Sequence, residues 1–178
     1  MHKSILKFWF KEIKPSQWWK KDEEFDKLIK LRFLKLHNKA KSLELIDWRN
    51  TGKGRLAEII ILDQFSRNIY RNTSQAFQND ALALNLSQSA IKNRIEIELK
   101  EEELLFIYMP LMHSESLPIQ KKSVKLFETL GLKNNFEYAL KHYEVIKKFG
   151  RFPHRNNILN RKSTLEEKKF LIKPGSSF

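Results

Sequence analysis

Residues 55–66, RLAEIIILDQFS, decide the fold class of this 178-residue chain. Within them Ile59–Leu62 are four consecutive apolar residues, so a helix with 3.6 residues per turn is apolar on nearly every side here. A helix of that kind is buried at the centre of its domain. Alternation of apolar and polar residues, which marks a strand, never continues beyond a few residues. The segment therefore predicts an all-α fold around a central buried helix.

Apolar periodicity, caps and breakers predict further helices on both sides of this segment. The expected helices are Ser4–Phe10, one that begins near Asp22, Arg55–Ser66, Ala76–Asn93, one from Glu101 that Pro110 ends or kinks, Ser116–Leu130, Asn135–Phe149 and a short one after Ser163. Ser163 and Glu166 have the spacing of a capping box. The glycines at 52 and 54 are expected to form a linker turn. Because the connections are short, we expect one domain over residues 1–178, a stack of about seven to nine antiparallel helices.

Composition excludes several classes of function. The chain has no cysteine, which rules out disulfide scaffolds, thiolate zinc sites, iron-sulfur clusters and cysteine nucleophiles, and fits a reducing compartment. The longest mostly apolar run, Leu104–Met112, is less than half of the roughly 20 residues that a membrane span needs. The first residues also lack the apolar stretch of a signal peptide. We expect a cytoplasmic protein that makes no contact with a membrane.

The formal net charge of +13 is concentrated near the ends of the chain. Residues 1–42 contribute +7, residues 43–150 contribute +1 and residues 151–178 contribute +5. Of the 34 cations 25 are lysines, and most are spaced among apolar residues, as on a solvated helix face. Charge of this kind predicts non-specific attraction to nucleic acid at most.

The arginines are distributed differently from the lysines. Seven of the nine fall in residues 49–71 and 151–161. Arginine is favoured where a planar fork binds a carboxylate or a phosphate. These two segments are therefore where we expect a functional site.

A first polar cluster lies at the end of the central helix. Ile60, Asp63 and Arg67 share one helix face, so apolar neighbours carry a carboxylate and a guanidinium toward the interior. A structural interpretation pairs Asp63 with an arginine, or lets it cap backbone N–H groups of the next turn. A functional interpretation makes Arg67, Asn68 and Arg71 converge on an anion. The structural interpretation predicts that Asp63 is mostly buried.

A second cluster is the pair His113 and Glu115 at a helix junction. The two residues could form an acid-base pair, or part of a metal site if other ligands arrive from elsewhere. The structural alternative is a packing or capping histidine.

A third cluster follows the helix that contains His142. Its spacing from Tyr138 and Val145 places His142 on the core side. Arg151, His154 and Arg155 then lie on a turn bounded by glycine and proline, which suits rigid recognition of an anion. Phosphate loops, nucleophile elbows, zinc-protease and dinucleotide motifs are absent from the sequence.

These clusters, in this order, resemble the bacterial family called domain of unknown function 924. The resemblance implies an all-helical, TPR-like fold and brings no activity, although TPR-like folds commonly bind proteins. It rests on Phe8-Trp9-Phe10, Trp18, Phe25-Asp26, Arg32-Phe33, Leu62-Asp63-Gln64-Phe65, Arg67-Asn68, Arg71, Ala76-Phe77, Asp80, Phe106–Pro110, His113-Ser114-Glu115, Gln120, His142 and Phe149–Asn156. Ser66 departs from the family's usual proline, and Asn72 and Asn160 from its usual glycine. Asparagine tolerates left-handed backbone, so these turns can persist.

The leading hypothesis is a binding module with one arginine- and histidine-rich pocket for an anionic small molecule or an acidic peptide. It needs no cofactor and no metal, and it leaves the oligomeric state open. The candidate ligand-binding residues, which we expect to meet in space, are Asp63, Gln64, Arg67, Asn68, Arg71, His113, Glu115, His142, Arg151, His154, Arg155 and Asn156. One alternative is a hydrolase-like enzyme that uses Asp63, His113, Glu115 and His142, with or without a metal. Another is surface-driven, non-specific RNA binding.

Overall fold

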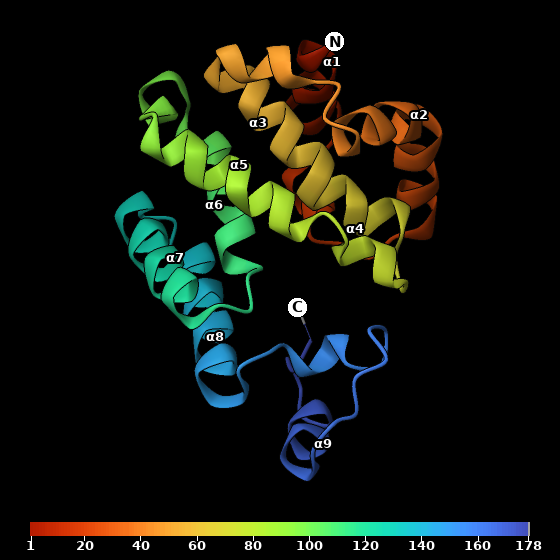
Figure 1. Cartoon of the computed structure of the whole chain (residues 1–178), viewed down its shortest axis with the longest axis vertical. Helices are drawn as coiled ribbons and strands as arrows, with labels where there is room; N and C mark the ends of the chain where they lie inside the picture. The colour runs from red at the N-terminus through yellow and green to blue at the C-terminus, as the bar shows by residue number, and fades with distance from the viewer. Residues whose placement is uncertain (178) are drawn as a thin grey trace. The chain divides into compact units, whose positions relative to one another are not determined.

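The computed structural model describes residues 1–177, apart from the side chain of Glu96, and this part of the chain is helical without a strand (Figure 1). Its α-helices are α1 (His2–Lys7), α2 (Glu23–Lys41), α3 (Gly52–Ile60), α4 (Ser66–Ile69), α5 (Asp80–Lys92), α6 (Glu101–Met112), α7 (Leu117–Leu130), α8 (Lys133–Phe149) and α9 (Leu165–Leu171). Two π-helical turns, Phe8–Glu12 and Ile61–Phe65, extend α1 and α3. Short 3₁₀ turns lie at Pro15–Trp18, Ile46–Asn50, Ser74–Phe77, Ile95–Glu98 and Pro153–Arg155. The predicted all-α fold class is confirmed.

Two compact units make up the chain. The N-terminal unit consists of Met1–Arg71 and Gln75–Pro110, and the C-terminal unit consists of Asn72–Ser74 and the chain from Leu111 onward. A single domain over residues 1–178 and a TPR-like stack stay predictions. Within the described residues, no helix combines the length and the low polarity that crossing a bilayer requires.

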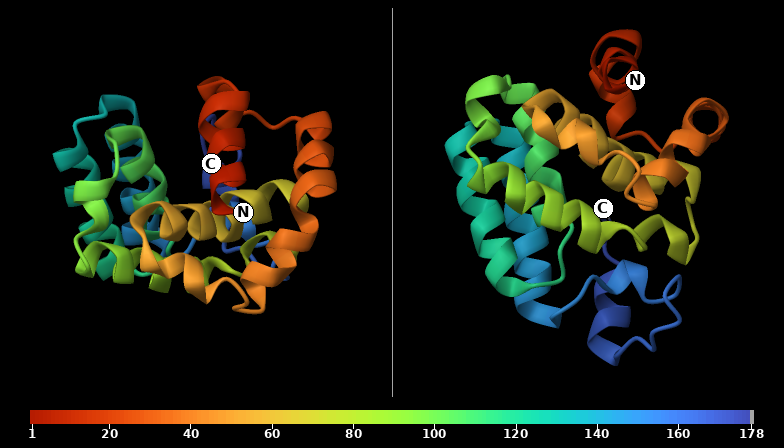
Figure 2. Two further views of the ribbon diagram at one scale, coloured as in Figure 1. Left: turned by 90° about the horizontal axis from the view of Figure 1, so that it is seen from above. Right: turned by 45° about the horizontal axis from the view of Figure 1, so that its top comes forward.

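The central helix predicted from residues 55–66 is the core of the N-terminal unit. Helix α3 contacts α1 and α5 (Figure 2), and its residues Ile59 and Ile60 have no exposed surface. The π-helical turn adds Phe65, whose ring lies 5.0 Å from that of Phe33 and 5.5 Å from that of Trp9. Burial of large aromatic rings is the main stabilising contribution in such a core.

The C-terminal unit is built on the pair α7 and α8, which lie side by side (Figures 1 and 2). Gly131 ends α7 and Gly150 ends α8, with φ of 76° and 68°. These left-handed values are the C-cap conformation that favours glycine. Val145 and Ile146 of α8 pack with Phe152 in the core of this unit.

Several boundaries differ from the sequence-based predictions. Helix α5 begins at Asp80 instead of near Ala76, which lies in a 3₁₀ turn, and α6 continues past Pro110 to Met112. Gly52 and Gly54 form the first turn of α3 instead of a linker, because Thr51 caps the helix by accepting a hydrogen bond from the N–H of Gly54 at 3.1 Å. Glycine is needed at position 54, because a Cβ atom there would lie 2.0 Å from the carbonyl oxygen of Trp48. The central helix continues to Ile69 through its π-helical turn. The capping box of α9 is one residue later than predicted, at Thr164 and Glu167.

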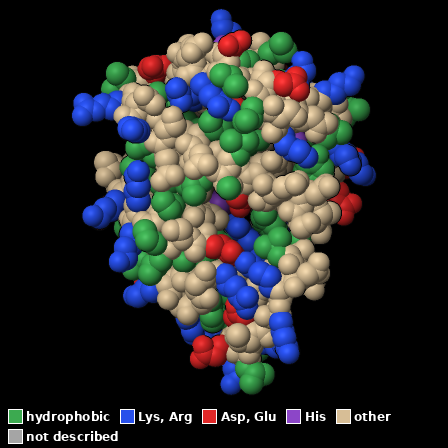
Figure 3. Space-filling view, in the orientation of Figure 1, with side chains coloured by type: hydrophobic (Ala, Val, Ile, Leu, Met, Phe, Trp, Pro, Cys, Tyr) green, Lys and Arg blue, Asp and Glu red, His purple; other side chains and the backbone are tan. Residues whose placement is uncertain are grey.

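Other predictions at helix ends and turns are confirmed. Asp22 caps α2 by accepting hydrogen bonds from the backbone N–H groups of Glu24 and Phe25, both at 3.1 Å. Asn72 and Asn160 have positive φ of 61° and 53°, so asparagine does serve left-handed turns at these positions. Lys and Arg side chains are spread over the visible face, with Asp and Glu among them (Figure 3).

Candidate functional site

The carboxylate of Asp63 is held inside the N-terminal unit. Its side chain is 1% exposed and lies 3.2 Å from Nη1 of Arg67, while Gln64 donates to its other oxygen at 2.7 Å. Arg67 also donates to both oxygens of Asp80, at 3.0 and 3.1 Å. Burial lowers the pKa of Arg67, but the charges of Asp63 and Asp80 outweigh burial and raise it overall. The predicted burial and arginine pairing of Asp63 are confirmed.

Arg71 and Asn68 meet a carboxylate from the second helix. Arg71 binds both oxygens of Asp26, and Asn68 donates to the same carboxylate at 2.8 Å. The hydrogen bond to Asp26 raises the pKa of Arg71. In the N-terminal unit, therefore, the predicted donors Arg67, Asn68 and Arg71 are engaged by carboxylates of the chain itself.

A buried histidine near this network was missed by the sequence reasoning. His37 of α2 has no exposed surface, and its Nε2 lies 2.8 Å from Oγ of Ser66, which in turn lies 2.6 Å from the carbonyl oxygen of Leu62. Asn79 donates to the same hydroxyl at 3.2 Å. Burial lowers the pKa of His37 to about 4. The available signal was its position four residues after Phe33, on the apolar stripe of α2.

The second and third clusters do meet in the C-terminal unit. Glu115 accepts two hydrogen bonds from Arg161, at 2.7 and 2.9 Å, and one from the backbone N–H of Phe152 at 2.8 Å. Burial raises the pKa of Glu115, but the hydrogen bonds from Arg161 and Phe152 lower it overall. Both carboxylate oxygens are thus used by groups other than His113, the partner that an acid-base pair would require.

Arg151 joins the turn to the last helix. It donates from Nε and Nη2 to the two oxygens of Glu167, at 2.6 and 2.8 Å, and from Nη2 to the carbonyl oxygen of Lys162 at 2.9 Å. Glu167 is 2% exposed, and the hydrogen bond from Arg151 lowers its pKa to about 2. This fork-to-fork pair anchors α9 to the end of α8.

Arg155 has different surroundings from the other two arginines of this segment. Its guanidinium lies over the ring of Phe152, 4.6 Å from the centroid, and its Nη2 donates to the carbonyl oxygen of His113 at 3.1 Å. The side chain is 6% exposed. The rings of His142 and His154 lie 5.5 and 5.6 Å from the Phe152 ring. Two histidines and one arginine therefore gather around the Phe152 ring, and the ring of His113 lies 6.4 Å from that of His142.

Asn156 closes the same turn. It is 1% exposed and donates to Oγ of Ser163 at 3.1 Å. Among the residues that the structure describes, no group of three or more His, Asp or Glu side chains is arranged to hold a metal ion. Whether the cluster around Asp63 shares a pocket with these residues stays a prediction.

His142 is held as a neutral imidazole. Its Nδ1 lies 2.8 Å from the carbonyl oxygen of Tyr138, which can only accept, so Nδ1 carries the proton. Burial, and then the electrostatic effect of His113, lower the pKa of His142 to about 3. The unfolded chain, with the ordinary value near 6.5, therefore binds one proton more between pH 6.5 and 3.

We expect acid to destabilise the protein through His142. The contribution of the neutral imidazole is fully present above pH 6.5 and is lost as the pH falls toward about 3, with a slope of about 1.4 kcal/mol per pH unit. Urea denaturation followed by circular dichroism at several pH values measures it. His142→Gln is expected to show a smaller dependence of stability on pH than wild type, because the proton that His142 takes up on unfolding is lost. The dependence does not vanish, because His37 still contributes in both proteins. Equal slopes would contradict this assignment.

The fold and these contacts define a class: an all-helical protein in which partly buried arginines bind carboxylates brought from distant parts of the chain. The chain belongs to the family described as bacterial protein of unknown function (DUF924), which it matches over residues 5–175. It is similar to the solved structure of a protein of unknown function from Agrobacterium tumefaciens, with 34% identity, a TM-score of 0.91 and 96% of each chain covered. A comparison with curated proteins found no match.

Proposed function

We propose that the protein is a binding module whose C-terminal unit binds an anionic small molecule or the acidic terminus of a peptide. The observation that carries this proposal is the buried guanidinium of Arg155, which lies on the Phe152 ring among His113, His142 and His154. A guanidinium in surroundings of low dielectric attracts carboxylate or phosphate more strongly than one in water does.

The neighbouring ion pairs support this assignment of roles. Arg151 and Arg161 each form a two-point ion pair with a carboxylate, Glu167 and Glu115 respectively. They fix the turn on both sides of Arg155, as a rigid binding site requires. The electrostatic effect of Arg155 also lowers the pKa of His142, after burial and the effect of His113. An anion bound beside these groups would be stabilised by the same positive potential.

A cytoplasmic location is part of the proposal, supported by a chain without cysteine, which fits a reducing compartment. Fractionation of cells that express the tagged protein would test it. The alternative hypothesis of a metal-assisted hydrolase has less support, because Arg161 and the backbone N–H of Phe152 already bind the carboxylate of Glu115.

Arg155→Lys is expected to keep the charge and the fold while weakening a bidentate interaction with the anion. Thermal denaturation is measured at constant ionic strength with inorganic phosphate, citrate, phosphorylated metabolites and acidic peptides. A bound anion at 100 times its Kd adds about 2.7 kcal/mol to the native state, or roughly 5 to 10 °C for a chain of this size. We expect that shift in wild type and a much smaller one in Arg155→Lys.

Arg94→Lys is the matched control, because it makes the same chemical change at an exposed arginine. Its response to anions is expected to equal that of wild type. If no anion stabilises wild type and Arg155→Lys melts at a lower temperature without any ligand, Arg155 has a structural role and the proposal is wrong.

A further inference from the structure

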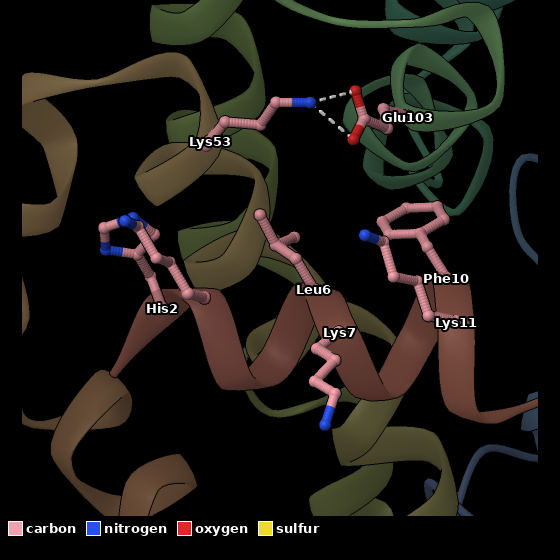
Figure 4. A pocket seen from close by; sticks show the side chains of 8 residues that line it. His2, Leu6, Lys7, Phe10, Lys11, Lys53 and Glu103 are labelled. Carbon is pink, nitrogen blue, oxygen red and sulfur yellow. Dashed lines mark hydrogen bonds and ion pairs between the residues drawn. The ribbon is translucent and has the colours of Figure 1, made fainter.

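A pocket of about 300 Å³ lies along helix α1 in the N-terminal unit, and none of the candidate ligand-binding residues lines it (Figure 4). Six of its residues come from α1 and the π-helical turn that follows, and Lys53 of α3 and Glu103 of α6 complete it. The six are His2, Lys3, Leu6, Lys7, Phe10 and Lys11. Its volume is at the lower end of the range for sites that bind a ligand or an inserted side chain.

The floor of this pocket is apolar. Leu6 and Phe10 are four residues apart, so they lie on one face of the helix, and both are half-buried. Figure 4 shows both side chains on the side of the helix that faces the Lys53–Glu103 ion pair. An apolar side chain of a partner that covers these two residues would remove their exposed surface from water.

The rim of the pocket is positively charged. Lys3, Lys7 and Lys11 are spaced four residues apart and form a stripe of about 12 Å along the helix. Lys7 lies 3.6 Å from Glu12. Lys3 and Lys11 are exposed, and within the described part of the chain neither has a carboxylate within 4.0 Å. Two cations are therefore available to a ligand on one side of the apolar floor.

The carboxylate on the other side is already neutralised. Both oxygens of Glu103 accept hydrogen bonds from the ammonium of Lys53, and one of them also accepts from the backbone N–H of Lys100 at 2.9 Å. Glu103 is 7% exposed. It therefore offers little repulsion to an approaching anion.

We propose that this pocket binds an acidic peptide segment of a partner protein. One apolar side chain of the segment would rest between Leu6 and Phe10, while carboxylates about two helical turns apart would pair with Lys3 and Lys11. The length of the lysine stripe favours such a segment over a small anion, which could reach one lysine at a time. This site is separate from the anion site proposed around Arg155 and does not depend on it.

An anionic membrane fits the pocket less well. Peripheral helices insert a large apolar face between lipids, but the largest apolar residues of this segment, Phe8 and Trp9, are 1% and 0% exposed because they pack into the core. Single-stranded nucleic acid would require exposed aromatic rings for stacking. In this pocket Phe10 is half-buried in the floor.

Fluorescence anisotropy with a labelled peptide of repeated Glu-Leu-Leu-Glu units tests the proposal, beside a matched peptide with Gln in place of Glu. The double variant Lys3→Glu with Lys11→Glu is expected to weaken binding of the acidic peptide by about tenfold or more. The control is Lys30→Glu with Lys35→Glu, which makes the same charge change at two exposed lysines of α2. Its affinity is expected to remain within about threefold of wild type.

A third variant, Leu6→Asn, separates the apolar floor from the charged rim. It leaves the charge unchanged and is expected to weaken binding severalfold, with circular dichroism confirming that each variant is folded. Equal weakening by the two double variants, or equal affinity for both peptides, would overturn the proposal. Tighter, pocket-dependent binding of labelled oligouridylate or of phosphatidylserine vesicles would also overturn it, in favour of nucleic acid or lipid.

Discussion

Replacing Asp63 with alanine is expected to lower the free energy of unfolding by about 3 to 5 kcal/mol. Asp63 is 1% exposed, and its carboxylate contacts Arg67 and accepts a hydrogen bond from Gln64. Its removal leaves a guanidinium that is one-fifth exposed with Asp80 as its remaining carboxylate. It also leaves the amide of Gln64 without that acceptor. A partly buried charge that loses a partner destabilises a fold far more than a lost surface pair does.

Urea denaturation followed by tryptophan fluorescence measures this change. All four tryptophans lie in the N-terminal unit, so the signal reports the unit that contains Asp63. Asp47→Ala, at an exposed aspartate of the same unit, is the control and is expected to change stability by less than about 0.5 kcal/mol. A transition midpoint for Asp63→Ala equal to that of the control would show that the ion pair is not stabilising.

Trp9→Ala is expected to destabilise the protein by about 3 to 5 kcal/mol, because it leaves a large cavity in the aromatic core. Trp9 has no exposed surface, and its ring lies 5.5 Å from the rings of both Phe65 and Phe106. Its backbone carbonyl also accepts a hydrogen bond from the indole of Trp18 at 2.9 Å. The neighbouring rings are held by other elements and can collapse only partly into the vacated space.

Trp19→Ala is the matched control for this loss. Trp19 is 50% exposed and stacks on Phe106 at 6.0 Å, so its replacement is expected to cost about 1 kcal/mol. Circular dichroism at 222 nm is the suitable probe, since both variants remove a fluorophore. A similar loss in the two variants would show that the core tolerates the cavity at position 9.

Local signals in the sequence predicted where several helices lie and which of their residues are buried. The apolar run Ile59–Leu62 predicts a buried helix and the pattern from Asp22 predicts a helix start, and both predictions are confirmed. The glycines at 131 and 150, which end α7 and α8, likewise act within a few residues. The helix boundaries that differ from the predictions also have local causes. Helix α3 begins at Gly52, where Thr51 caps its first turn and Gly54 fits against the carbonyl of Trp48, a contact that helical propensity does not encode.

The sequence by itself also determined that two polar residues of the candidate site are buried. The spacing of Asp63 from Ile60, and of His142 from Val145, places both on the core side of a helix, and both are buried. Helix periodicity is enough for this conclusion, because a side chain's direction follows from its position along the helix.

Only the tertiary structure decided which charges meet. Asp26 is 45 residues from Arg71, and Glu115 is 46 residues from Arg161, so no local pattern links them. Arg161, which binds a carboxylate, and Arg155, which lies on the ring of Phe152, cannot be told apart by their local sequence. What separates them is the packing of distant helices, because a buried guanidinium is stabilised by whichever carboxylate the fold brings within hydrogen-bonding distance.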